Sequence, residues 1–108
     1  MKPPRRRLEP EDRKRQILVA AVKLAEIYGY TNVTREAIAA LAECAPGLVS
    51  AYFGTMLRMY RAIMGEAIKT ENLPIIAQGL VLGDTRARKA PEDVKRRAAM
   101  SLLGQSDV

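Results

Sequence analysis

Apolar residues recur at steps of three and four near the start of the chain, which is the period of a helix with one buried face. Pro10 suits the first turn of such a helix and Gly29 suits its end, so residues 9–28 are predicted to form the first helix. Tyr30 and Val33 are expected to pack the following connection against the core. The apolar stripe comprises Ile17, Leu18, Ala21, Leu24, Ala25 and Tyr28.

Residues 34–53 carry two shorter apolar patterns with a proline between them. Thr34 is expected to cap the first of these helices, because its hydroxyl can accept from the free N–H groups of the next turn. Pro46 disfavours helical dihedrals at the residue before it but suits the first turn of a new helix. Two short helices with a tight break predict a helix-turn-helix, a module that commonly reads DNA with its second helix. The core side chains expected here are Ile38, Leu41, Ala42, Val49 and Phe53.

A fourth helix is predicted over residues 55–69, and the segment KTEN with Pro74 after it indicates a boundary. Beyond it, we expect an apolar helix over residues 74–83, a polar break over residues 84–90 and a last helix from Pro91 to about residue 104. The apolar face expected on the fourth helix comprises Leu57, Tyr60, Ile63, Met64, Ala67 and Ile68.

The two C-terminal helices are not expected to enclose a drug-sized cavity, which needs several hundred cubic ångströms lined on all sides. They could cap the bundle, or they could pair with a second copy of the chain. The second arrangement is favoured because one chain has so little core of its own. The side chains expected to be buried in such a dimer are Ile75, Ile76, Leu80, Val81 and Leu82.

Composition agrees with a helical bundle and favours a polyanionic partner. Apolar residues make up 48% of the 108 residues and aromatics only 5%, so the core must come from Ala, Leu, Ile, Val and Met. The net charge of +6 makes nucleic acid the first candidate partner and an anionic membrane the second. No apolar run approaches membrane-spanning length, so we expect a soluble, cytoplasmic protein that lies at the nucleoid when bound to DNA.

The absence of histidine and the single cysteine restrict the chemistry. Zinc sites of the usual His/Cys kind and His-dependent catalysis are excluded. We find no nucleophile–base pair, paired-carboxylate cleft or cofactor motif, so no enzyme, no cofactor and no metal is expected. An intramolecular disulfide is impossible, and for Cys44 a buried inert thiol is favoured over a redox sensor.

The string RQILVAAVKLAEIYGYTNVTREAIAALAECAPGLVSAYFGT resembles the N-terminal domain of the tetracycline-repressor (TetR) family of transcriptional regulators. The shared features are an apolar helix ending in Gly-Tyr, a Thr that begins the second helix and a third helix ending in Tyr-Phe. The resemblance covers residues 13 to about 64. It implies an all-α fold, a homeodomain-like three-helix bundle with a helix-turn-helix, joined by a linking fourth helix to a further helical region. Members act mostly as dimers on near-palindromic operators, usually as repressors.

Residue by residue, the resemblance implies a DNA-facing surface. Arg35 would face a phosphate or a base, and Glu36 would either accept from a base edge or take part in capping. Tyr52 and Thr55 would each offer a hydroxyl to a phosphate. The matching positions are Thr34, Arg35, Glu36, Pro46, Gly47, Leu48, Ser50, Ala51, Tyr52 and Thr55.

Two positions depart from the family pattern. Ala45 stands where a Ser or Thr usually caps the third helix, and Met56 stands where a Lys often meets a phosphate. Because phosphate contacts supply much of the affinity for DNA, other basic residues would have to compensate. Arg58 and Arg61 are candidates, and so is the arm of residues 1–8.

The arm itself has two interpretations. Arg5, Arg6 and Arg7 follow two prolines without an acidic neighbour. They form either a disordered tail that aids solubility or an arm that contacts phosphates or the minor groove.

Three segments follow from these patterns: the arm of residues 1–8, a DNA-binding domain over residues 9–70 and a short helical region over residues 71–108 that would dimerise. The function predicted is a sequence-specific double-stranded DNA-binding regulator, namely a small homodimeric repressor without its own ligand pocket or small-molecule effector. The alternative is a protein-interaction module that inhibits or recruits another regulator.

Overall fold

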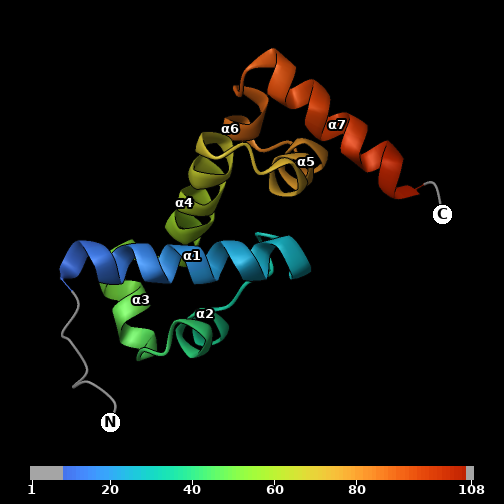
Figure 1. Cartoon of the computed structure of the whole chain (residues 1–108). Helices are drawn as coiled ribbons and strands as arrows, with labels where there is room; N and C mark the ends of the chain where they lie inside the picture. Colours follow the sequence, from blue (N-terminus) through green and yellow to red (C-terminus); the bar gives the residue numbers. More distant parts are fainter. Residues whose placement is uncertain (1–8, 107–108) are drawn as a thin grey trace, which may run out of the picture.

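The computed structural model describes residues 9–106, and for residues 105 and 106 only the backbone. This described part is helical, and no strand occurs in it (Figure 1). The all-α prediction is therefore confirmed. The helices are α1 (Pro10–Tyr28), α2 (Arg35–Ala42), α3 (Pro46–Phe53), α4 (Met56–Lys69), α5 (Leu73–Leu82), α6 (Thr85–Arg88) and α7 (Glu92–Ser106).

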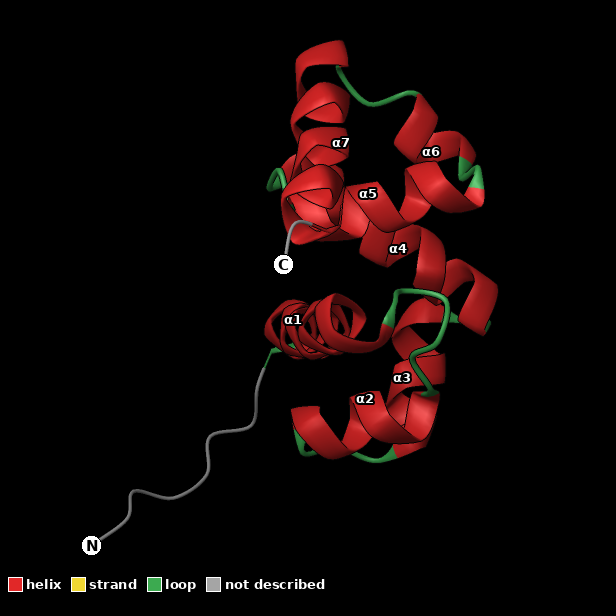
Figure 2. Ribbon diagram, turned by 90° about the vertical axis from the view of Figure 1, so that its right-hand side faces the viewer, coloured by secondary structure: helices red, strands yellow, loops and turns green. Residues whose placement is uncertain are grey.

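The helices form two groups joined by α4. In Figure 1, α2 and α3 lie on one side of α1, while α5, α6 and α7 lie on the other, and Figure 2 shows the same division from the side. We call α1–α3 the head and α5–α7 the C-terminal helices. Ile17, Ile38 and Val49 are buried in the head, and Met59 and Ile63 of α4 are buried as well. One hydrophobic core runs through both groups.

The predicted helix boundaries near the head have the expected caps. The hydroxyl of Thr34 accepts from the Ala37 N–H at 3.1 Å. Thr55 accepts in the same way from the Arg58 N–H at 3.2 Å, which begins α4. Gly29 ends α1 with φ +97°, a conformation that L side chains rarely adopt. These caps explain where α1 ends and where α2 and α4 begin.

The C-terminal helices bury, within one chain, much of the apolar surface that was expected to be buried in a dimer. Ile75 and Ile76 have no exposed area within one chain, so the prediction that a dimer buries them is wrong. The reason is that α5 packs against α7, α4 and α6 of its own chain. The last turn of α5 stays open, with Val81 71% and Leu82 60% exposed. Leu80 is half-buried.

The polar segment after α5 contains a short helix, α6, where a break was expected. Asp84 caps it, because its Oδ1 accepts from the N–H groups of Arg86 at 2.8 Å and Ala87 at 3.1 Å. Ala87 then points inward and is fully buried. Ala87 thus joins α6 to the hydrophobic core.

Three apolar side chains assigned to buried faces are exposed instead. Tyr28 is 63% exposed because it is the last residue of α1 and extends past the helices packed beneath it. Leu41 is 48% exposed because α2 turns only a narrow face inward. Leu57 of α4 is 58% exposed, while Met59 in the same helix is buried.

Candidate nucleic-acid interface

The exposed side of α3 is small and uncharged. Pro46, Gly47 and Ala51 are exposed, whereas Val49 and Phe53 turn into the core. A Cβ added to Gly47 would meet no atom within 4 Å, so the space before this turn is open. Another surface can therefore come close to the backbone of α3 at this face. The remaining predicted positions on α3, namely Leu48, Ser50 and Tyr52, are half-buried.

The start of α2 adds polar groups to this region. Thr34 and Glu36 are exposed in the first turn, and Arg35 between them is half-buried. The Arg35 Nε is shielded from solvent and has no hydrogen-bond partner among the described residues. An unsatisfied buried donor costs about 1–3 kcal/mol, so this side chain gains from any acceptor that lets it rearrange.

The two departures from the family pattern have structural outcomes. Ala45 occupies the N-cap of α3 without a side-chain hydrogen bond, as its side chain predicts. Met56 is half-buried and packs against the hydrophobic core, so this position serves packing. Thr55 beside it is exposed and caps α4. The beginning of α4 therefore presents a hydroxyl and no lysine.

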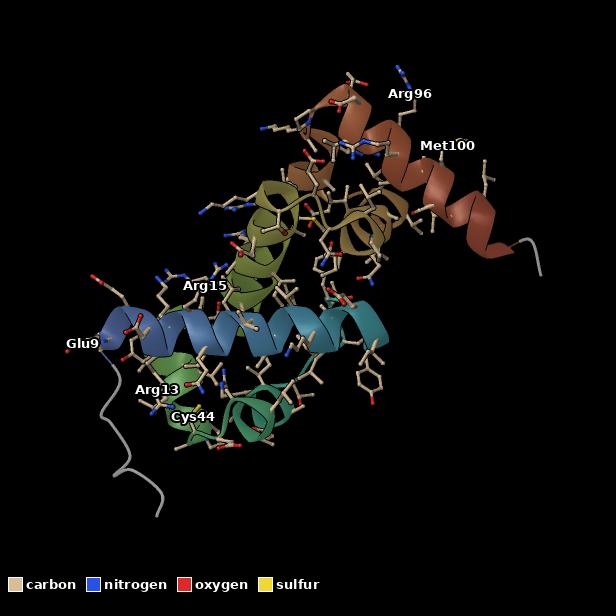
Figure 3. The ribbon with its side chains drawn as sticks, viewed as in Figure 1. Glu9, Arg13, Arg15, Cys44, Arg96 and Met100 are labelled. Atoms are coloured by element: carbon tan, nitrogen blue, oxygen red, sulfur yellow. The ribbon has the colours of Figure 1, made fainter. Side chains whose placement is uncertain are left out.

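Two basic residues of α1 contact neighbouring helices, one on α3 and one on α4. The Lys14 ammonium lies 5.5 Å from the centroid of the Phe53 ring, a cation–π contact between α1 and α3. Arg15 pairs with Glu66 of α4 at 2.7 Å. Figure 3 shows Arg15 on the side of α1 that faces α4, and Arg13 on the side that faces α3.

Two further sequence predictions concern Cys44 and the arm of residues 1–8. Cys44, at the turn between α2 and α3, is half-buried and lies against the core. Arg5, Arg6 and Arg7 lie outside the described residues.

A hydrogen-bonded joint connects the head to the C-terminal helices, and sequence reasoning missed it. The Gln78 side chain of α5 accepts from the Tyr30 N–H at 2.9 Å and donates to the Ala25 carbonyl oxygen at 3.0 Å. The Tyr30 hydroxyl donates to Asp84 Oδ2 at 2.8 Å. Burial first, and then the bond to Asp84, raise the pKa of the Tyr30 hydroxyl above its ordinary value. The connection after α1 is thus tied to both α5 and the cap of α6.

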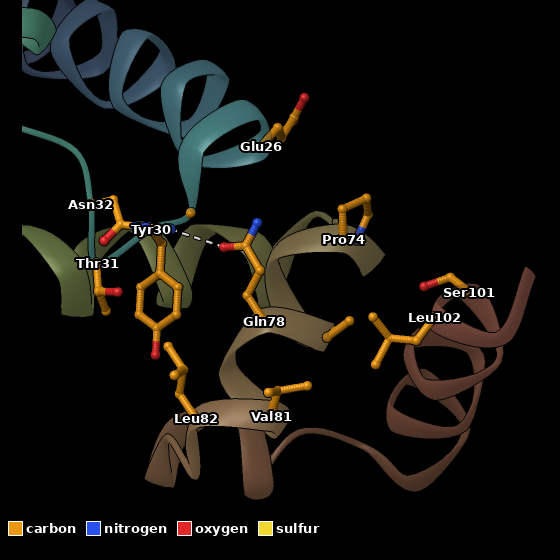
Figure 4. Close-up of a pocket in the computed structure, with 12 residues that line it drawn as sticks. Glu26, Tyr30, Thr31, Asn32, Pro74, Gln78, Val81, Leu82, Ser101 and Leu102 are labelled. Carbon is orange, nitrogen blue, oxygen red and sulfur yellow. Dashed lines mark hydrogen bonds between the residues drawn. The ribbon is translucent and has the colours of Figure 1, made fainter. Parts of the chain in front are cut away.

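An open cavity of about 470 Å³ lies beside this joint (Figure 4). Thr31 and Asn32 of the head line one side, and Val81, Leu82 and Leu102 line the other. Its volume falls within the usual range of small-molecule sites, roughly 300–1,000 Å³. The expectation that the two C-terminal helices alone do not enclose such a cavity stays a prediction, because this cavity is open and the head supplies one of its walls. The expected absence of a small-molecule effector stays a prediction.

Other classes of site have no counterpart in the described residues. They contain no group of three or more His, Cys, Asp or Glu side chains placed to hold a metal ion. None of the described helices combines the length and the apolar character that a membrane crossing requires.

Comparison with known families decides what the head is. Residues 17–63 match the family model of bacterial regulatory proteins of the tetR family. The match begins at the buried Ile17 of α1 and ends at the buried Ile63 of α4, so it contains the whole helix-turn-helix. The head is a tetR-family helix-turn-helix domain. This family consists of DNA-binding regulators of transcription. Searches of the curated proteins and of the solved structures found no match.

Proposed function

We propose that this tetR-family chain is a homodimeric repressor that binds a near-palindromic operator through α3. The observation that carries the proposal is the uncharged, sterically open side of α3 around Gly47, on a head with a buried hydrophobic core. A rigid scaffold that presents one short helix this way suits insertion into a major groove. Leu48 and Ala51 would contact thymine methyl groups there.

The groups around α3 would fix its register on the duplex. The Arg35 Nε has no hydrogen-bond partner within the residues that the structure describes, and phosphate oxygens accept well from arginine. Tyr52 and Thr55 would donate their hydroxyls to phosphates on either side of the groove. Thr34 and Glu36 extend the same surface at the start of α2.

A second copy would pair through the outer side of α7. Met100 is 60% and Leu103 is 65% exposed, and Ala99 beside them is exposed as well. Figure 3 shows Met100 and Arg96 on the side of α7 that faces away from the other helices. Residues at this spacing share one face of a helix, so two copies could pack their α7 stripes together. The two heads would then meet half-sites about one helical turn apart or a little more.

The direct test is a retardation assay with the DNA just upstream of the chain's own coding region. We expect binding that weakens steeply as salt rises. Arg35→Ala should weaken it and lower the salt slope by about 1, because it removes one charged phosphate contact. Tyr52→Phe should weaken it with the slope unchanged, because the hydroxyl that it removes carries no charge. Arg88→Ala removes the same charge from the exposed surface of α6, outside both the assigned DNA face and the outer side of α7, and should bind like the parent. If Arg35→Ala and Arg88→Ala behave alike, the assigned DNA face is wrong.

Light scattering after size exclusion tests the dimer. The parent should have the mass of two chains, and Met100→Glu should have the mass of one with unchanged helical content. A parent that is monomeric and indifferent to DNA would instead support an interaction module that recruits or inhibits another regulator.

A further inference from the structure

Three arginines from two helices meet on the outside of α4. Arg58 and Arg61 lie one turn apart on this helix, and Arg86 reaches them from α6. The Arg86 Nη1 approaches the Arg61 carbonyl oxygen at 3.5 Å, which holds it along α4. Together with Ala62, these side chains line a shallow hollow of about 330 Å³. No carboxylate lines it. We call this the arginine hollow.

No ion pair in the described part of the chain neutralises the positive charges of the hollow. The ion pairs among the described residues involve Arg15, Lys95 and Arg97, and none involves an arginine of the hollow. The carboxylates of α4 and of the α6 cap are engaged elsewhere: Glu66 pairs with Arg15, and Asp84 accepts from Tyr30 and from backbone N–H groups. Holding three like charges together without a counter-charge is unfavourable, so the arrangement favours an anion between them.

The donors suit one anion in particular. A guanidinium presents its N–H groups in a planar fork that matches the oxygens of a phosphate, and such bidentate pairs are short and strong. Three forks converging from different directions can satisfy several oxygens of one phosphate. An ammonium-lined or mixed-charge hollow would lack this selectivity.

We propose that Arg58, Arg61 and Arg86 form a binding site for a phosphate group. The site begins where α3 meets α4, because the Arg58 Cδ lies 3.1 Å from the place that a Cβ would take on Gly54. A backbone phosphate of bound DNA and a free phosphate present the same oxygens. If DNA is the source, the inference rests on the function proposed above and makes α6 part of the DNA-binding surface. If the source is free phosphate, it stands without that function.

Two arms of one experiment separate these sources. The first measures the affinity for the upstream DNA over a range of salt for the parent, Arg86→Ala, Arg58→Ala and Arg88→Ala. Arg88 is the matched control, since it is exposed in the same short helix but does not line the hollow. The second arm titrates inorganic phosphate into each protein without DNA and follows amide chemical shifts of α4 and α6. Circular dichroism confirms that each variant keeps its helices.

For a DNA phosphate, Arg86→Ala and Arg58→Ala should each lower the salt slope by about 0.9, while Arg88→Ala leaves it near the parent's. For a free phosphate, the parent should show saturable shifts, and the two hollow variants should bind about tenfold more weakly or worse. The proposal is overturned if Arg86→Ala and Arg88→Ala match in both arms. A parent that binds phosphate but no DNA would refute the proposed function and leave the site standing.

Discussion

A methyl group added to Gly79 would test how closely the C-terminal helices pack on α4. A Cβ at this position would lie 2.5 Å from Met64 Cε, 2.8 Å from Ala87 Cβ and 3.3 Å from Asp84 Cβ. The Met64 methyl group can swing aside, because it is the end of a flexible side chain. The Ala87 Cβ is fixed to the backbone of α6, so this contact can be relieved only if α5 and α6 separate.

The magnitude follows from two opposing effects. Alanine in a helix interior is more favourable than glycine by about 1 kcal/mol. Overpacking of a well-filled core costs about 1–3 kcal/mol. Gly79→Ala should therefore lower the free energy of unfolding by about 0–2 kcal/mol. Gly65→Ala is the matched control in α4, where the nearest atom would be Arg86 Nη1 at an ordinary 3.5 Å. It should raise the free energy of unfolding by about 0.5–1 kcal/mol.

Urea unfolding followed by circular dichroism measures both variants against the parent. The quantity of interest is the difference between the two alanine variants, expected at about 0.5–3 kcal/mol in favour of Gly65→Ala. Equal stabilities would mean that α6 does not press on α5 as described, and the reasoning would fail.

Two further predictions concern the joint between the head and the C-terminal helices. Gln78→Met keeps the side-chain length but leaves the Tyr30 N–H without its acceptor. It should therefore lower the free energy of unfolding by about 1–3 kcal/mol in the same urea assay. An unchanged free energy of unfolding would show that the joint does not stabilise the fold. The raised pKa of Tyr30 means that the unfolded chain loses this proton first, so stability present at neutral pH should decline as pH rises above about 10. Tyr30→Phe should flatten that decline, whereas Tyr28→Phe, at an exposed position, should leave it unchanged.

Much of the head could be predicted because its signals are local. Thr34 caps a helix through its own hydroxyl, and Gly29 ends one through its own backbone. Neither requires knowledge of a distant partner. The same holds for the open side of α3, since Pro46 and Gly47 set both where that helix begins and how little side chain it carries.

What could not be predicted depends on partners far away in the sequence. Gln78 reads as one polar residue in an apolar helix, and its role appears only when Ala25 and Tyr30 come within 3.0 Å of its amide. In the sequence, Arg86 likewise looks like part of a charged turn, and its position beside α4 is visible only in the structure. Leu41 fits the apolar period of α2, but it lies beside the narrow face that α2 turns inward and is exposed. Spacing shows which side chains share a helix face, and only the packing of neighbours shows which face is covered.

The dependence of α7 on a single neighbour has a consequence for how the chain comes apart. α7 packs chiefly on α5, whereas α5 also contacts α4, α6 and α1. Buried residues of α7 such as Val94 and Ala98 therefore lose their cover in one step, without any change in the head. We therefore expect the last helix to peel away more readily than the helices of the head open. Such an opening would leave the proposed DNA-binding surface intact while uncovering apolar area on α5, so aggregation would start at the end of the molecule opposite to α3.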